Sequence, residues 1–216
     1  RQVLGIPTDT VHCDLIFTAP SVATYGEEMI ARLCKCHHVQ IPASQYVPGS
    51  IIQNYVVEVH RAVPMLEGHL GYTAAAKHLT APIWVIDVGN RTSIATLVAP
   101  DGDILQRRPF DESGVWAIAA SLVSAELLPL KTPSTQQVID YLFTTDASVS
   151  EIIAPAITAS VTDLLTFIGS SSADRYLIGG GAQLPGIETV LQAQSVKDPQ
   201  WANVKAIAEL AEEILV

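Results

Sequence analysis

An aspartate ends a run of apolar residues in the stretch IDVGNRTS, which begins at Ile86. Asp87 is followed by Gly89 and then by the hydroxyl residues Thr92 and Ser93. Glycine lets a ligand approach the backbone closely, and backbone N–H groups in such a turn can surround a phosphate oxygen. A carboxylate would repel that phosphate unless a hydrated Mg²⁺ lay between them. Asp87 therefore fits an outer ligand of a magnesium nucleotide or an acceptor for an attacking water. The alternative is a turn aspartate that accepts backbone amides.

A second candidate loop is RYLIGGGAQLPGIE, in which Gly179, Gly180 and Gly181 follow a predicted strand. Such a loop lets the backbone approach a nucleotide, and the N-terminus of the helix expected after it favours anionic groups. The alternative is a connection whose glycines serve only close packing between strand and helix. Each loop is a weak signal alone, and the two together, in this order, indicate a nucleotide site more strongly.

Cys34, Cys36, His37 and His38 form a compact group of potential metal ligands. Two thiolates and two imidazoles could bind zinc, but structural zinc sites usually draw Cys-x₂-Cys pairs from two segments. The third cysteine, Cys13, is distant in sequence, so tetrahedral closure would be strained. The sequence favours a helix end with buried sulfurs and exposed histidines, and it leaves metal binding open.

The composition excludes several classes of partner. The 216 residues carry a formal charge of −10, which disfavours direct nonspecific binding to nucleic acid because phosphate attraction needs a basic surface. No uninterrupted apolar stretch reaches the roughly 20 residues of a membrane span, and no signal peptide is visible, so we expect no membrane association. The odd number of cysteines, three, fits a reducing cytoplasm better than a disulfide framework. We therefore expect a cytoplasmic protein.

Hydrophobic periodicity predicts an α/β chain in which hairpins and helices are mixed, rather than a strict βαβ repeat. Proline at position 64 is expected to end a strand. The expected strands cover residues 3–6, 55–63, 83–86, 93–98, 104–108 and 175–178. The expected helices cover residues 27–35, 69–79, 113–128, 135–143, 149–168, 186–194 and 202–216.

Four segments resemble motifs of the actin-like ATPase superfamily, which includes Hsp70 and the sugar kinases, or of one group within it. IDVGNRTSIATLVAPDGDI resembles its second phosphate motif, and YLIGGGAQLPGIE resembles its adenosine motif. The ending DPQWANVKAIAELAEEI resembles the P-x-x-A-N-x-x-G segment of the plasmid-segregation actins, the ParM/StbA-like proteins, and the opening VLGIP resembles their GLP strand end. The resemblance implies an actin-like (ribonuclease H-like) two-lobed ATPase fold. Residues 1–84 would be the remainder of the first lobe, 85–195 the second lobe, and 196–216 a helix returning to the first.

The resemblance also implies roles for single residues. Asp87, Gly89 and Thr92 match the acid, glycine and hydroxyl of the phosphate motif, near the β- and γ-phosphates and the metal-bound water. Glu67 is the candidate for orienting the attacking water, and the alternative is a helix N-terminal cap. The implied cofactors are ATP and Mg²⁺, the metal being held by Asp87 through water. The implied site comprises Asp87 and Glu67 as catalytic residues, with Gly89, Asn90, Arg91, Thr92, Ser93, Gly179, Gly180, Gly181 and Ala182 binding the cofactor.

The chain departs from the family pattern at three points. The first phosphate motif, an Asp-x-Gly hairpin, is absent, because Asp14 has no glycine after it. Ser93 is followed by Ile94 where an acid is usual, and Ala206 stands where the ParM-like ending has glycine. From the first departure we expect that the N-terminal part of the first lobe is missing from this chain, or that hydrolysis has been lost.

The resemblance implies an ATPase whose cycle drives self-association into filaments, which act on plasmid copies through a DNA-binding adaptor protein. One alternative is a non-hydrolysing scaffold of the FtsA/PilM type that binds nucleotide and recruits partners. The acidic helix at the end of the chain is a poor match to the membrane-targeting tail of FtsA, but PilM lacks such a tail. Another alternative is a sugar or acetate kinase, which would need a substrate pocket and a catalytic aspartate in the first lobe.

Overall fold

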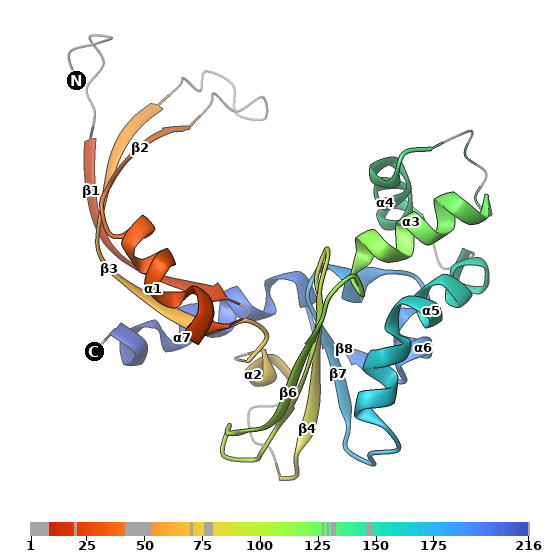
Figure 1. Cartoon of the computed structure of the whole chain (residues 1–216). Helices are drawn as coiled ribbons and strands as arrows, with labels where there is room; N and C mark the ends of the chain where they lie inside the picture. The colour runs from red at the N-terminus through yellow and green to blue at the C-terminus, as the bar shows by residue number, and fades with distance from the viewer. Residues whose placement is uncertain are drawn as a thin grey trace. The chain divides into compact units, whose positions relative to one another are not determined.

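The structure is a computed structural model of the chain, and it describes residues 9–19, 21–41, 53–69, 71–75, 80–126, 128, 130, 133–145 and 149–215. The chain divides into two compact units, Arg1–Glu67 with Leu210–Val216, and Gly68–Glu209 (Figure 1). From the sequence we expect one lobe to end at residue 84 and the next at residue 195. These lobe boundaries stay a prediction. The expected strand 3–6 and part of the expected helix 69–79 lie outside the described residues.

The first unit contains a three-stranded sheet in the order β1-β3-β2. Strand β3 (Gln53–Leu66) pairs in parallel with β1 (Asp9–Ala19) and antiparallel with β2 (Cys36–Ile41). Helix α1 (Val22–Leu33) packs against β3, where the buried Gly26 lies beside the ring of Pro64. The helix starts five residues earlier than residue 27, because the side chain of Ser21 caps it by accepting the Thr24 N–H at 3.2 Å.

Two sequence predictions about this unit are wrong. Strand β3 continues through Pro64 to Leu66, because β2 pairs with β3 only as far as Glu58. Beyond that point β3 is an edge strand among the described residues, and edge strands tolerate proline. His37 and His38 lie in β2 rather than at a helix end, since α1 ends at Leu33.

The second unit is built on a five-stranded sheet in the order β6-β5-β4-β7-β8. Its first three strands in sequence, β4 (Ile83–Val88), β5 (Ser93–Val98) and β6 (Ile104–Phe110), form the predicted antiparallel hairpins. Strand β7 (Arg175–Ile178) pairs in parallel with β4, and β8 (Gln194–Ser195) pairs in parallel with β7. All six residues of β4 are buried, so this central strand has protein on both faces.

Helices cover one face of this sheet and share its larger core, to which β4 contributes Trp84, Ile86 and Val88. Figure 1 shows these helices gathered on one side of the strands. They are α3 (Val115–Ala125), α4 (Thr135–Thr144), α5 (Ser150–Ile168) and α6 (Ile187–Leu191). Helix α6 is shorter than the expected 186–194, because Gln192 adopts a left-handed conformation and β8 follows.

The opposite face of the sheet carries a smaller apolar cluster that includes Ile83 and Val85 of β4. The start of α7 (Ala202–Leu215) packs there through Ala202, and α2 (Tyr72–Ala75) contributes Tyr72. Because successive strand residues point to opposite faces, Asp87 shares this face with Ile83 and Val85.

Helix α5 is long and apolar enough to cross a membrane when only its length and composition are considered. Its residues Ile153, Ile157, Val161 and Leu164 are completely buried in the larger core of the second unit. This packing is that of a core helix, so the helix by itself is weak evidence for a membrane span.

Candidate functional site

Asp87 lies at the end of β4 and is only 6% exposed. The Nδ2 amide of Asn203 donates a hydrogen bond of 2.8 Å to its Oδ2 atom. Two glycines border the carboxylate. A Cβ at Gly68 would lie 3.2 Å from the Cβ of Asp87, and a Cβ at Gly179 would lie 2.3 Å from Oδ1. The carboxyl group is therefore oriented by a side-chain donor and lined by backbone on two sides.

The loop between β4 and β5 is held by the first amides of α3. The N–H groups of Gly114, Val115 and Trp116 donate to the carbonyls of residues 91, 89 and 90, at 3.1, 3.1 and 2.8 Å. The N–H of Gly89 also donates to the carbonyl of Thr92 at 3.0 Å, which closes the loop. The amides at the start of α3 thus orient the loop.

This arrangement fixes the direction of the other loop amides. Within one planar trans peptide, the C=O group and the following N–H group point in opposite directions. Because the carbonyls of Gly89, Asn90 and Arg91 point to α3, the N–H groups of Asn90, Arg91 and Thr92 point away from it. Successive amides directed to one side form a concave site for an anion. The Arg91 guanidinium stacks over the Trp116 ring at 5.3 Å, which ties its side chain to α3.

Ser93 begins β5 and is completely buried. Its N–H donates to the Ser113 hydroxyl at 3.0 Å, and its own hydroxyl donates to the Ser113 carbonyl at 2.9 Å. The Ser113 hydroxyl in turn donates to the Phe110 carbonyl at 2.5 Å. These bonds brace the loop against the start of α3. The predicted contact of Ser93 with phosphate stays a prediction, as does that of the half-buried Thr92.

The glycine loop follows β7 directly, and its three glycines differ in their surroundings. A Cβ at Gly179 would collide with Asp87 and Val88, and one at Gly181 would lie 2.3 Å from the Val88 side chain. A Cβ at Gly180 would meet nothing within 4 Å. Packing therefore explains two of the glycines and not the third. Ala182 is buried in the larger core, so its side chain serves packing.

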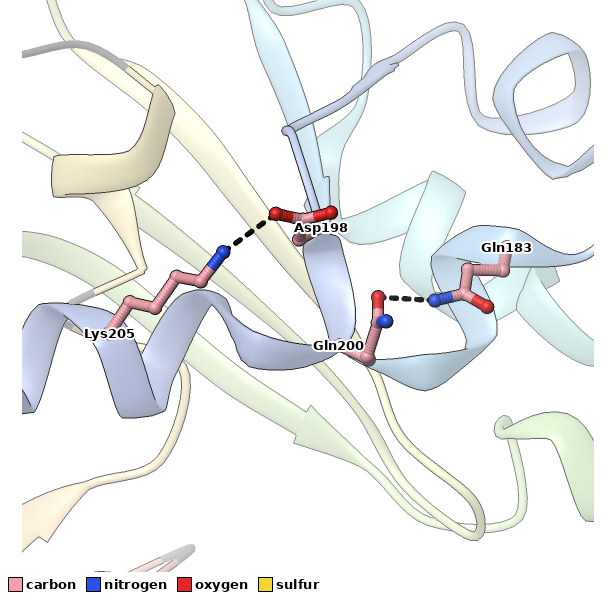
Figure 2. A network of polar contacts seen from close by, with 4 residues as sticks. All are labelled: Gln183, Asp198, Gln200 and Lys205. Atoms are coloured by element: carbon pink, nitrogen blue, oxygen red, sulfur yellow. Dashed lines mark hydrogen bonds and ion pairs between the residues drawn. The ribbon is translucent and has the colours of Figure 1, made fainter. Parts of the chain in front are cut away.

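The segment before and within α7 joins the two loops. The N–H of Gly179 donates to the Pro199 carbonyl at 2.9 Å. Figure 2 shows the Gln183 amide, from the short helix η2 (Gly180–Gln183), donating to Gln200, from η3 (Pro199–Trp201). It also shows Lys205 of α7 paired with Asp198 at 2.7 Å. The hydrogen bond and positive charge of Lys205 lower the pKa of the Asp198 carboxyl group.

Three of the residues that position the site were missed by the sequence prediction. Asn203, Gly68 and Ser113 contact Asp87 or brace its loop. Only Asn203 had a signal in the sequence, since it is the asparagine of the ANVKA segment that resembles the plasmid-segregation actins.

Glu67, the predicted water-orienting residue, is the last residue of the first unit, whereas Asp87 belongs to the second. Its backbone N–H donates to the Ala19 carbonyl at 3.0 Å. The helix that follows begins at Tyr72 and has no acidic residue in its first turn, which does not fit the alternative of a helix cap. The catalytic role of Glu67 stays a prediction.

No model of a known protein family matches this sequence, and no curated protein matches it. Solved structures do match. The archaeal actin homologue Ta0583 is 16% identical, with a TM-score of 0.65 over 97% of this chain and 71% of its own. The actin-like protein Alp7A is 10% identical, with a TM-score of 0.62 over 95% of this chain and 69% of its own. MreB5 of Spiroplasma citri is 12% identical, with a TM-score of 0.55 over 73% of this chain and 61% of its own. The predicted actin-like α/β fold is therefore confirmed.

Proposed function

We propose that this chain, which has the actin-like fold, is a cytoplasmic protein that binds ATP with Mg²⁺ and assembles into filaments of the plasmid-segregation type. The loops at Asp87 and Gly179 would hold the nucleotide. A DNA-binding adaptor protein, rather than the acidic chain itself, would couple the filaments to DNA.

The main observation that supports the proposal of nucleotide binding is the orientation of the loop after β4. The amides of Asn90, Arg91 and Thr92 point away from α3 and are available as a group to phosphate oxygens. Asp87 lies at the start of that loop with its carboxylate held by Asn203. Mg²⁺ prefers oxygen ligands and keeps several of its waters, so it suits a single carboxylate beside phosphates.

The solved structures give nucleotide binding independent support. Ta0583 has been solved in complex with ADP, and MreB5 has been solved bound to AMPPNP. Both nucleotides carry the phosphates that the Asp87 loop would hold. In the proposed site, Asp87 would hold the metal through water and would be an acceptor for the attacking water, and Gly180 would let the nucleotide lie directly against the backbone.

Filament assembly rests on the resemblance of the segment DPQWANVKAIAELAEEI to the plasmid-segregation actins. A filament needs a heterologous contact that does not close into a ring. Trp201 and Val204, in that segment, expose 55% and 58% of their surface. Burial of two such apolar side chains would favour a contact between subunits.

The test is to measure binding of a fluorescent ATP analogue with and without Mg²⁺, then phosphate release and light scattering. Asp87→Ala should weaken Mg²⁺-dependent binding and abolish hydrolysis, while the matched control Asp163→Ala, at an exposed position on α5, should behave as wild type. Absence of nucleotide binding in the wild-type chain would overturn the proposal. Binding without hydrolysis or assembly would replace the filament proposal with the nucleotide-binding scaffold of the FtsA/PilM type.

A further inference from the structure

Three potential metal ligands meet on the sheet of the first unit, separate from the residues proposed to bind nucleotide. They are His12 of β1 and Glu58 and His60 of β3, and their ligand atoms all lie within 4.8 Å of one another. The Nδ1 atom of His12 is 3.0 Å from Oε2 of Glu58 and 3.1 Å from Nε2 of His60. Among the described residues, this is the one group of three or more such side chains close enough to share an ion.

Strand register explains why the three side chains meet. His12 is the direct partner of Glu58 in the parallel ladder between β1 and β3. Glu58 and His60 are two residues apart on one strand, and their ligand atoms lie within 4.8 Å of each other. The register shifts after Cys13, so that Asp14 pairs with Arg61 and His60 is the extra residue of a bulge. Bulges are rare in parallel pairs and often redirect a side chain at a functional position.

Two of the three distances between ligand atoms are close to what a small tetrahedral ion requires. With zinc–ligand bonds of about 2.0 to 2.1 Å, two ligand atoms of a tetrahedral site lie about 3.3 Å apart. The two distances from Nδ1 of His12, 3.0 Å to Oε2 of Glu58 and 3.1 Å to Nε2 of His60, are close to that value. The imidazole rings have their centroids 5.3 Å apart and their planes inclined by 25°, and the facing nitrogens, Nδ1 of His12 and Nε2 of His60, lie 3.1 Å apart.

We propose that His12, Glu58 and His60 bind one divalent transition-metal ion, for which Zn²⁺ is the best match. Two imidazoles and one carboxylate form a set of three protein ligands that leaves the fourth zinc position open to water or substrate. Both histidines are exposed and Glu58 is half-buried, so solvent reaches that open position. The ion joins β1 to β3 at the bulge, a link between segments 46 residues apart in the chain, from position 12 to position 58.

This site differs from the group of potential metal ligands recognised in the sequence, which comprises Cys34, Cys36, His37 and His38. In the structure, a ring nitrogen of His37 lies 2.8 Å from the Leu33 carbonyl, and His38 lies exposed on β2. The site also differs from the magnesium site proposed at Asp87, because Mg²⁺ selects oxygen ligands whereas imidazole suits zinc.

The experiment uses the full chain without an affinity tag, treated with a chelator and then titrated with Co²⁺ as a spectroscopic probe for Zn²⁺. We expect one tetrahedral Co²⁺ per chain, displaced by Zn²⁺, and a higher melting temperature when either metal is present. Removing a residue that only hydrogen-bonds to a metal ligand typically lowers metal affinity by roughly 10- to 100-fold. His12→Asn and His60→Asn remove the ligands themselves, so each should weaken metal binding by about 100-fold or more. His38→Asn is the matched control and should bind as wild type.

Three outcomes would overturn the site. One is binding that survives in His60→Asn, and another is binding that is lost in the double variant Cys34→Ser and Cys36→Ser. The third is an absence of Co²⁺ binding at one ion per chain. Because His12 and His60 are exposed, their variants should match the wild type in circular dichroism and in melting temperature without metal. Metal binding is measured without nucleotide, so it succeeds or fails independently of the ATP proposal.

Discussion

Alanine substitutions at Gly179 and Gly180 separate the structural and functional roles of the loop after β7. Gly179 has φ +84° and ψ 169°, a backbone region that only glycine populates readily. An added Cβ would lie 2.3 Å from Oδ1 of Asp87 and 2.6 Å from the Val88 carbonyl oxygen. At Gly180, one residue later, the added Cβ would meet nothing within 4 Å. The same substitution should therefore reduce stability at Gly179 and nucleotide affinity at Gly180.

The expected loss of stability for Gly179→Ala has two parts. Backbone strain in that region costs about 1 to 3 kcal/mol, and overpacking against fixed atoms costs about 1 to 3 kcal/mol more. The sum is roughly 2 to 6 kcal/mol, which at about 2 to 4 °C per kcal/mol lowers the melting temperature by about 4 °C or more. Gly180→Ala should stay within about 0.5 kcal/mol of wild type, since nothing surrounds the added methyl group.

Thermal unfolding by circular dichroism and binding of a fluorescent ATP analogue test both substitutions. Gly180→Ala should keep the wild-type melting temperature and bind the nucleotide more weakly, because its methyl group would occupy the space the nucleotide needs. A wild-type melting temperature for Gly179→Ala would refute the contact between Gly179 and Asp87. Wild-type nucleotide affinity in Gly180→Ala would favour the alternative in which the glycines serve packing alone.

Three further substitutions test the contacts around the two loops. Asn203→Ala removes a donor to the Asp87 carboxylate, so it should cost about 1 to 3 kcal/mol in chemical unfolding and weaken Mg²⁺-dependent nucleotide binding. Ser113→Ala leaves the buried Ser93 N–H without its hydroxyl acceptor and should cost about 1 to 3 kcal/mol in urea unfolding, whereas Ser113→Thr keeps the hydroxyl as a control. Lys205 lowers the pKa of the Asp198 carboxyl group below its usual 3.8, so the stability gained from this exposed pair is present above that pH and is lost as pH falls through the lowered pKa. Lys205→Met should therefore melt slightly below wild type at neutral pH and converge with it in acid, as measured by thermal scans across pH.

The first hairpin of the second unit was predictable from sequence because β4 and β5 are short, largely apolar and close in the chain. The expected strands at 83–86, 93–98, 104–108 and 175–178 correspond to β4, β5, β6 and β7. Every residue of β4 is buried, so its apolar run is a strong signal even without alternation. The predicted helix at 149–168 matches α5, whose apolar residues recur at helical spacing.

The sheet of the first unit was less predictable because its strands carry polar residues and pair over long distances. Strand β1 contains Thr10, His12, Cys13 and Asp14, and several of these side chains are exposed. Such a strand shows neither a continuous apolar run nor a clear alternation. Its partner β3 begins at Gln53, and nothing in a single sequence specifies which distant segment will pair with it or where a bulge will shift the register.

In the candidate sites too, contacts between residues distant in the sequence could not be predicted. Asp87 and Gly179 stood out because a carboxylate or a glycine run after an apolar strand is visible locally. Asn203 reaches Asp87 from 116 residues away, and His12 reaches His60 from 48 residues away. Neither partner can be assigned until the fold brings the two segments together.

Parallel pairing is the feature that turns two separate loops into one site. In the register between β4 and β7, Asp87 lies opposite Ile178. The chain therefore leaves both strands at the same end, the end where their carboxyl termini lie. The loop at Gly89 and the loop at Gly179 must therefore begin side by side, and carboxyl ends of adjacent parallel strands are where α/β proteins bind ligands. If β7 were antiparallel to β4, its glycines would lie at the opposite end of the strands, away from Asp87. The hydrogen bond from Gly179 to Pro199 and that from Asn203 to Asp87 then anchor the start of α7 at the same edge. The ending that resembles the plasmid-segregation actins is thus part of the site's framework, because it contributes a direct contact to Asp87.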